Sequence, residues 1–186
     1  MRSQATPPPT SAGRRWLAVL VVVAVLLFVA GGADAIAHAI AGPPIQIAGV
    51  TLHPQAGWKV QRRGDEGSLH RVVLARGSGA LDVTVIDAYP GTADGLARQY
   101  QDSVLAGQLD QLSVGDPEAG ALNDGTPTVR YGYIGITHDG VAVEGVVTTA
   151  VGPEGTGVVF DGYAPKGGLA SVVGGLASMI DQTEVR

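Results

Sequence analysis

The side chains that could carry chemistry are few and widely spaced in this 186-residue sequence. No His-Glu-x-x-His pattern offers a metal site, and no Gly-x-Ser-x-Gly motif offers a nucleophilic serine. The glycine-rich runs lack the lysine of a phosphate-binding loop and are typical of turns. Cysteine is absent, which excludes disulfides, thiolate catalysis and iron–sulfur clusters. We therefore predict no enzyme, no catalytic residue, no metal and no cofactor, and we interpret four histidines as surface or hairpin-end residues: His38, His53, His70 and His138.

A more specific candidate is a polar face on a long hairpin between residues 128 and 151. The dipeptide Asp139-Gly140 is typical of a two-residue hairpin turn, and such a turn would pair Gly135 with Glu144. In that register one face is aliphatic and the other is mixed. Because an unpartnered carboxylate is costly to bury, the mixed face predicts a contact with a small ligand or a partner protein. Its candidate binding residues are Tyr131, Tyr133 and Glu144.

These residues also have simpler interpretations. The mixed face could be half-solvated, or Glu144 could be neutralised by a basic group such as Arg130 or Lys59. A fourth candidate, Trp58, follows a Pro54-to-Gly57 turn and is either a binding aromatic or a plug in the core or at its rim. The sequence leaves these alternatives open.

Hydrophobic patterning predicts the elements that must position these side chains. A helix over 92–109 is indicated by apolar residues at helical spacing, with Thr92 as its N-cap. A second amphipathic helix is predicted over 169–180, and residues 114–126 are predicted to be a loop. Alternation and turn signals predict strands over 45–52, 58–60, 69–75, 80–88, 128–138, 141–151 and 156–163. The order predicts an α+β fold, in which helices flank an antiparallel sheet.

The longest apolar segment, Trp16–Ala33, precedes this domain. It has no charged side chain, follows Arg14 and Arg15, and as a helix would span roughly one hydrocarbon thickness. The positive-inside rule then predicts a disordered cytoplasmic tail (1–15), a transmembrane signal anchor (16–33), a linker (34–44) and an extracytoplasmic domain (45–186). The alternative is a signal peptide cleaved near Ala35, although the apolar run is long for one. We expect a single-pass plasma-membrane protein with a cytoplasmic N-terminus, which contacts the lipid bilayer through Trp16–Ala33.

Charge is divided unequally along the chain. Three of the 12 Lys and Arg residues precede the apolar segment, which leaves 9 against 16 Asp and Glu from Pro43 onward. An acidic domain without a basic stripe argues against nucleic acid, because cationic contacts to phosphate dominate that kind of binding. We expect no nucleic-acid partner.

Several local motifs carry a resemblance to a known superfamily. They are a Pro54-x-x-Gly57-Trp58 turn after a first strand, a helix containing Tyr100, the long hairpin, and a closing helix that ends in Met179-Ile180. Their order resembles the superfamily of the photosystem II accessory protein PsbP and the yeast Ran-binding import factor, as in small actinobacterial envelope proteins of unknown function. The resemblance spans Ile45–Arg186 and implies an α/β/α sandwich and a non-enzymatic accessory or binding module. No functional residue of either relative is matched.

Two functions follow as expectations. The first is a membrane-anchored envelope protein whose extracytoplasmic domain binds or scaffolds an envelope protein or a small apolar ligand. The alternative is an exported soluble binding protein for a small apolar ligand, released by cleavage near Ala35. An apolar pocket with a few convergent polar groups would favour a small ligand, whereas a large exposed apolar patch would favour a protein partner.

Overall fold

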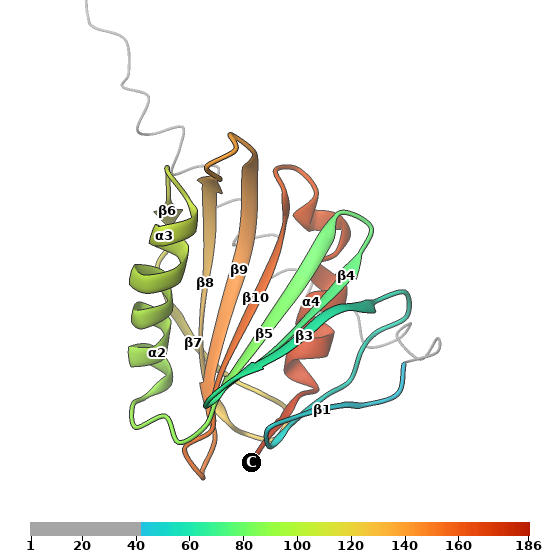
Figure 1. Ribbon diagram of the computed structural model, residues 1–186, viewed down its shortest axis with the longest axis vertical. Coiled ribbons are helices and arrows are strands. Elements are labelled where there is room, and N and C mark those ends of the chain that lie inside the picture. Colours follow the sequence, from blue (N-terminus) through green and yellow to red (C-terminus); the bar gives the residue numbers. More distant parts are fainter. Residues whose placement is uncertain (1–41) are drawn as a thin grey trace, which may run out of the picture.

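The computed structural model describes residues 42–186, and its largest element is an eight-stranded antiparallel sheet (Figure 1). Its strand order is β3-β4-β5-β10-β9-β8-β6, and β7 also pairs with β8. Every pairing between these strands is antiparallel. The strands are β3 (Lys59–Glu66), β4 (Leu69–Arg76), β5 (Gly79–Ile86), β6 (Ser113–Val114), β7 (Glu118–Ala121), β8 (Pro127–Ile136), β9 (Ala142–Val151) and β10 (Gly157–Pro165).

Helices cover both faces of this sheet. One face carries a continuous helical segment that contacts β8, β9 and β10 and consists of α2 (Ala93–Tyr100), the π-helical turn η1 (Gln101–Leu105) and α3 (Ala106–Gln108). The other face carries α4 (Val173–Asp181), which follows the 3₁₀ turn η2 (Leu169–Ser171) and lies behind the sheet in Figure 1. A small second sheet lies on this side and contains β1 (Ile45–Ile47), β2 (Val50–Leu52) and β11 (Glu184–Val185). The α+β class with an antiparallel sheet and flanking helices is therefore confirmed.

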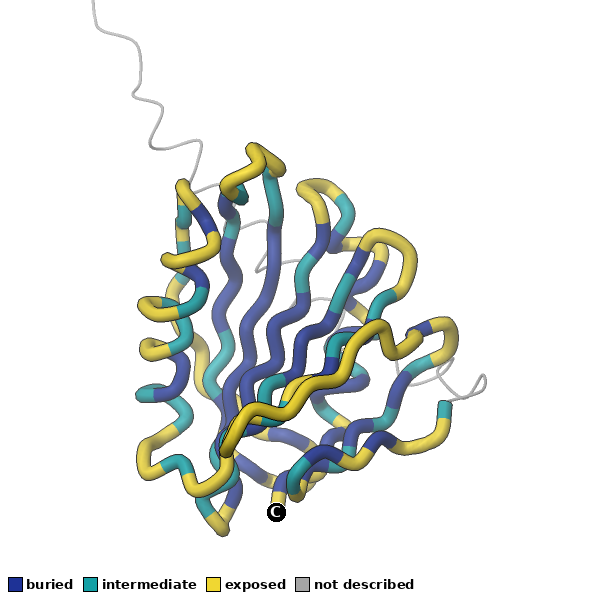
Figure 2. Tube along the Cα trace, viewed as in Figure 1, coloured by how far each residue is buried: buried dark blue, intermediate teal, exposed yellow. Residues whose placement is uncertain are grey.

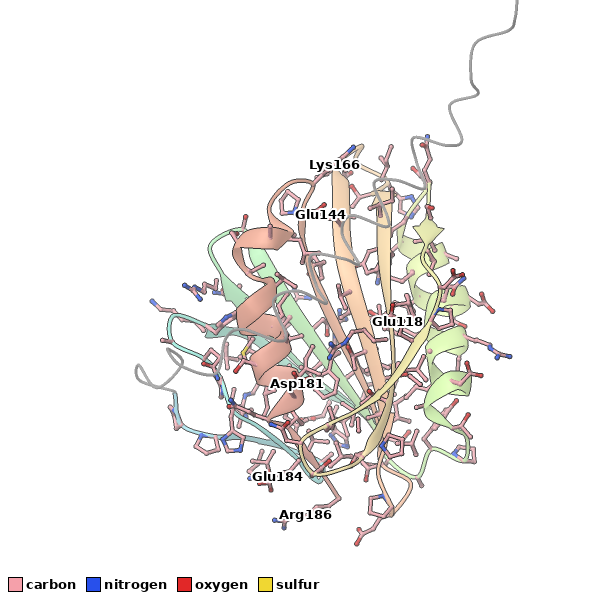
Figure 3. All side chains as sticks on the ribbon, turned by 180° about the vertical axis from the view of Figure 1, so that it is seen from behind. Glu118, Glu144, Lys166, Asp181, Glu184 and Arg186 are labelled. Carbon is pink, nitrogen blue, oxygen red and sulfur yellow. The ribbon has the colours of Figure 1, made fainter. Side chains whose placement is uncertain are left out.

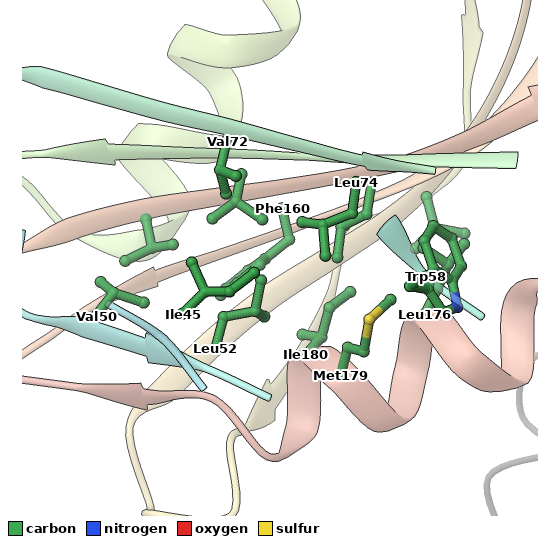
Figure 4. Packing of buried hydrophobic residues seen from close by; sticks show 14 of the residues in the cluster. Ile45, Val50, Leu52, Trp58, Val72, Leu74, Phe160, Leu176, Met179 and Ile180 are labelled. Carbon is green, nitrogen blue, oxygen red and sulfur yellow. The ribbon is translucent and has the colours of Figure 1, made fainter. Parts of the chain in front are cut away.

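Strand alternation gives the sheet two apolar cores. On β10, Val158 and Phe160 belong to the core beneath α4, whereas Val159 belongs to the core beneath α2. Figure 4 shows Phe160 above the α4 side chains Met179 and Ile180. Strands β8, β9, β10 and β5 are mostly buried on both faces, whereas every residue of the edge strand β3 is exposed (Figure 2). The α2-side face of the sheet is therefore more exposed at its β3–β4 end than at its centre.

Several elements differ from their predicted bounds. The single strand predicted over 45–52 is two strands, because Ala48 and Gly49 both have positive φ angles and turn the chain between them. The predicted loop over 114–126 contains β7, and β3 is longer than the predicted strand over 58–60. Polar side chains dominate β3, and β7 has the sequence Glu-Ala-Gly-Ala, so neither strand shows the apolar alternation by which strands are identified. The N-cap prediction is confirmed, since the Thr92 hydroxyl accepts a hydrogen bond from the Gly95 N–H at 3.2 Å.

The described residues contain no helix that is both long and apolar enough to cross a membrane. The predicted anchor Trp16–Ala33, the tail before it and most of the linker lie outside the described residues.

Candidate functional site

The hairpin register is shifted by one residue from the predicted one. The β8–β9 loop has three residues instead of two, because Thr137 and Val141 close it, with Gly140 at φ +80°. Tyr133 therefore pairs with Gly145, and Glu144 pairs with Ile134. A one-residue shift moves one strand's side chains to the other face. The predicted common face is wrong: Tyr131 and Tyr133 lie on the α2 side, and Glu144 lies on the α4 side.

Glu144 is buried and satisfied by backbone groups. Its Oε1 accepts hydrogen bonds from the N–H groups of Gly167 and Leu169, both at 3.0 Å. The carboxylate thus ties β9 to the loop that leads into η2, where Figure 3 places it near Lys166. Arg130, an expected alternative partner, binds Asp181 at 3.1 Å instead. Glu144 therefore stabilises a loop and does not lie beside the two tyrosines.

Trp58 lies in the core beneath α4. Its side chain is 7% exposed and packs at Gly175, where a Cβ atom would approach the indole nitrogen to 3.0 Å. Figure 4 shows the ring beside Leu176. The indole N–H is the one buried side-chain polar atom without a hydrogen-bond partner among residues 42–186. Of its two interpretations, the core plug matches this position.

The two tyrosines instead lie beside a buried carboxylate that the sequence analysis did not single out. Asp161 on β10 is 4% exposed and accepts a hydrogen bond from Tyr133 at 2.9 Å and one from Tyr100 at 2.8 Å. Tyr133 reaches it across Gly145, where a Cβ atom would lie only 2.5 Å from the tyrosine ring. These three side chains, Asp161, Tyr100 and Tyr133, are called the Asp161 cluster below.

Burial controls the electrostatics of this cluster. It raises the pKa of Asp161 to about 7, although the hydrogen bonds from Tyr100 and Tyr133 act in the opposite direction. Burial also raises the pKa values of both tyrosines, and the neighbouring Asp161 raises them further. The hydroxyls therefore remain protonated donors, and the carboxyl group is the member of the cluster that titrates near neutral pH.

A second carboxylate lies directly beside the first. Asp82 on β5 is the cross-strand partner of Asp161 and is itself buried. Arg71 on β4 neutralises it, because the arginine Nε lies 2.8 Å and 2.9 Å from the two carboxylate oxygens and Nη2 also donates to one of them. This hydrogen bonding raises the pKa of Arg71. Two like charges opposite each other destabilise a sheet, and the bidentate arginine offsets that repulsion.

The helix above the cluster is held by further polar contacts. The Tyr131 hydroxyl donates to the Ala97 carbonyl at 3.3 Å, and the Thr149 hydroxyl donates to the Ala93 carbonyl at 2.7 Å. Directly after Tyr100 the helix widens into the π-helical turn η1. Such turns are rare overall, and those that occur often lie at functional sites.

A cleft of about 500 Å³ lies between this helix and the exposed α2-side face of β3, β4 and β5. Its size is within the range of small-molecule sites, roughly 300–1,000 Å³. The apolar part of its lining contains Leu69, Ile86, Leu96, Val104 and Val159.

Polar groups line the rest of the cleft. Strands β3, β4 and β5 contribute Arg62, Arg71 and Thr84, and the helix contributes Gln99, Tyr100 and Ser103. The cleft thus combines an apolar floor with a few converging donors, beside the Asp161 cluster. Of the residues predicted to bind, Tyr131 and Tyr133 do not line the cleft; they hydrogen-bond to Ala97 in the helix and to Asp161. Glu144 and Trp58 lie on the opposite side of the sheet.

Sequence reasoning missed Asp161, Tyr100, Asp82 and Arg71. One signal was present, since Asp161 and Asp82 each interrupt an otherwise apolar strand at a central position. A carboxylate in such a place requires a partner, but the partners come from a helix and from strands that are distant in the chain.

The chain is similar to known proteins in its structure, whereas comparison of its sequence finds no match. No protein-family model matches the chain, and no curated protein matches it in sequence. The structure is similar to cyanobacterial PsbP (CyanoP) from Synechocystis sp. PCC 6803, with a TM-score of 0.54 and 17% identity over 83% of this chain and 96% of that chain. It is also similar to the Saccharomyces cerevisiae Ran-binding protein Mog1p, with a TM-score of 0.52 and 13% identity over 78% of this chain and 95% of that chain. Identities this low carry information about the fold alone.

Proposed function

We propose, from the premise that this chain has the PsbP/Mog1 fold that its sequence resemblance predicted, that it is a non-enzymatic binding module. Its binding site is the cleft beneath α2 and η1, and its ligand is a small, largely apolar molecule. The segment Trp16–Ala33 anchors the module in the plasma membrane, with its N-terminus cytoplasmic and its domain extracytoplasmic.

The cleft is the observation that carries this proposal. An apolar floor with a few converging polar groups is typical of a small-molecule site. The exposed large hydrophobic side chains of residues 42–186 are Val60, Leu69 and Val141, which lie at opposite ends of the β3–β4 hairpin and in the β8–β9 loop. They do not form one apolar patch of the kind that marks a protein partner. A small ligand is therefore favoured over protein docking.

The state of the buried carboxylates supports binding without catalysis. Both oxygens of Asp161 accept tyrosine hydroxyls, and both oxygens of Asp82 accept the Arg71 guanidinium. A general acid or base needs an oxygen within hydrogen-bond reach of its substrate. The hydrogen bonding assigns these oxygens to the protein itself, so the pair acts as a support for the cleft wall.

Filling the cleft tests the proposed site. Gly64 lines it, and a Cβ atom added there meets nothing within 4 Å, so we expect Gly64→Phe to fold and to occupy the mouth of the cleft. The full chain in phosphatidylcholine nanodiscs would be photolabelled with an uncharged diazirine analogue of decanol, and the labelled peptides would be identified by mass spectrometry. We expect labelling of β4, β5 and α2 peptides to fall about tenfold in Gly64→Phe, because the ring removes the apolar contact area.

Arg63→Phe is the matched control for this experiment. Arg63 immediately precedes Gly64 on the same exposed strand. It pairs with Val72, which belongs to the core beneath α4, so Arg63 lies on the side of the sheet opposite the cleft. Its substitution should leave labelling of the cleft unchanged. Equal labelling of wild type and Gly64→Phe, or labelling that spreads evenly over the surface, would contradict the proposed site.

Membrane anchoring has its own test. We expect the full-length chain to stay in the membrane pellet after extraction with alkaline carbonate, because an apolar helix through the bilayer is not removed by breaking polar contacts. A variant with three leucines of the segment, Leu20, Leu26 and Leu27, replaced by lysine is the control and should not remain integrated. Release of the wild-type chain into the wash, with a new N-terminus near Ala35, would support the exported soluble protein instead.

A further inference from the structure

We propose that the ligand of the cleft is an amphipathic anion, whose carboxylate or phosphate head lies between Arg62 and Arg71 and whose apolar body covers the floor. This inference rests on the proposed function, since it names the class of ligand for the same cleft. It is carried by the distribution of polar and apolar groups along the cleft.

The strand register arranges the cleft in three rows across β3, β4 and β5. The first row contains Glu66, Leu69 and Ile86, and the second contains Gly64, Arg71 and Thr84. The third row begins with Arg62 on β3 and ends at Asp82 on β5. One end of the cleft is therefore apolar except for Glu66 at its β3 edge, and its middle and other end carry the two guanidinium groups.

Both guanidinium groups have donors to offer. Arg71 uses Nε and Nη2 on Asp82, and its Nη1 makes no hydrogen bond within residues 42–186. Arg62 has no salt bridge there, although it lines the same cleft. The Asp82 contact fixes the Arg71 guanidinium in place before any ligand arrives, which lowers the entropic cost of binding. Arginine donors arranged in this way are suited to carboxylate and phosphate oxygens.

Hydroxyl groups extend this donor set. Thr84 is the cross-strand neighbour of Arg71, and Ser103 lies on η1 across the cleft. Within the described part of the chain neither hydroxyl makes a side-chain hydrogen bond, although both line the cleft. A head group with several acceptor oxygens would satisfy these hydroxyls together with the guanidinium groups.

The acidic groups of the cleft do not cancel this preference. The charge of Asp82 is offset by Arg71, which still has its Nη1 donor free, and Arg62 adds a positive charge that no carboxylate of residues 42–186 pairs with. Asp65 lies 2.7 Å from His70, and this hydrogen bond raises the histidine pKa. Glu66 lies in the first row, beside Leu69, at the end away from Arg62. A negative head group is thus attracted to the arginine end, and the carboxylate of Glu66 disfavours the reverse orientation.

Paired arginine variants test the charge preference. The full chain in phosphatidylcholine nanodiscs would be photolabelled with four diazirine probes of equal chain length: decanoate, decyl phosphate, decanol and decyltrimethylammonium. Arg62→Gln should lower labelling of the cleft by decanoate and decyl phosphate by about tenfold, as expected for one lost charge-assisted hydrogen bond. Labelling by decanol should not change. Arg63→Gln removes the same charge from the opposite side of the same strand and should leave all four probes unaffected.

The outcomes separate this inference from the proposed function. Loss of decanoate labelling but not of decyl phosphate labelling in Arg62→Gln would identify a carboxylate head, and the reverse would identify a phosphate head. Equal labelling by decanol and the two anions, unaffected by Arg62→Gln, would overturn the anion and leave the apolar site standing. Stronger labelling by decyltrimethylammonium would overturn it in favour of a cation at Glu66. Absence of labelling in the cleft by any probe would overturn both proposals.

Discussion

Phe160→Ala is expected to lower the free energy of unfolding of the domain by about 4 kcal/mol, the usual cost of removing a buried aromatic ring. Phe160 is fully buried at the centre of β10, in the core that the sheet shares with α4, β1 and β2. Its neighbours come from both ends of the domain, since Leu52 lies in the second strand and Met179 in the last helix (Figure 4). The surrounding chain cannot collapse into the cavity without moving both layers.

Pulse proteolysis of the full chain in nanodiscs, across a series of urea concentrations, measures this effect. Val141→Ala is the control, because Val141 is 49% exposed in the β8–β9 loop and its truncation should change stability by no more than about 0.5 kcal/mol. A loss below about 1 kcal/mol for Phe160→Ala would mean that the core beneath α4 is loosely packed.

Apolar periodicity was sufficient to predict most of the fold. Leu96, Tyr100 and Val104 recur at helical spacing, and the alternation of β8 to β10 identifies three consecutive strands before any contact is known. These patterns are local, and the order of elements then limits the possible sheets. The polar strand β3 was underestimated because an exposed edge strand does not need an apolar face.

The candidate site could not be predicted because it depends on register and on distant partners. Asp139-Gly140 fits both a two-residue and a three-residue loop, and the choice between them decides whether Glu144 lies beside Tyr133 or on the other side of the sheet. Likewise, the partners of Asp161 are Tyr100 and Tyr133, which are 61 and 28 residues away in the sequence. No spacing rule connects residues that only the folded sheet brings together.

Phe160 and Asp161 show how adjacent residues serve the two faces of one strand. Phe160 supports the apolar layer beneath α4, and Asp161 receives the tyrosines of the helix that forms the cleft wall. The carboxyl group is the less expected of the two, since a nonpolar residue would avoid the cost of desolvation. Its position ties the stability of the cleft wall to pH.

Asp161→Asn is expected to remove a large part of the pH dependence of stability. Burial raises the pKa of Asp161 to about 7, well above its value in an unfolded chain. An acid with a raised folded-state pKa binds its proton more tightly in the folded protein, so its stabilising contribution is full below the unfolded pKa and is lost as pH rises through the folded pKa. The total loss is about 4 kcal/mol, of which about 2 to 3 kcal/mol falls between about pH 5 and pH 8.

Asparagine keeps the shape of the side chain and carries no charge at any of these pH values. Its carbonyl oxygen can accept from Tyr100 or Tyr133, so the variant is expected to fold. The expected result also has a sign that a simple loss of contacts cannot give, because the variant should gain about 2 to 3 kcal/mol in stability relative to wild type between about pH 5 and about pH 8. Only below about pH 3, where Asp161 is protonated in both the folded and the unfolded chain, should the two proteins differ little.

The difference between the two urea-unfolding profiles isolates this group from the others that titrate nearby. Asp82, Arg71 and Tyr163 face Asp161 from β5, β4 and β10 and are present in both proteins. Two histidines on other parts of the surface also titrate. The pKa of His70 is raised by Asp65 and Asp87, and that of His138 by Gly107 and Asp110. Both histidines contribute equally to the wild-type and the variant protein. Parallel profiles, or a wild type that gains stability relative to the variant as pH rises, would show that Asp161 is held ionised. In that case the tyrosine hydrogen bonds would outweigh burial in setting its charge.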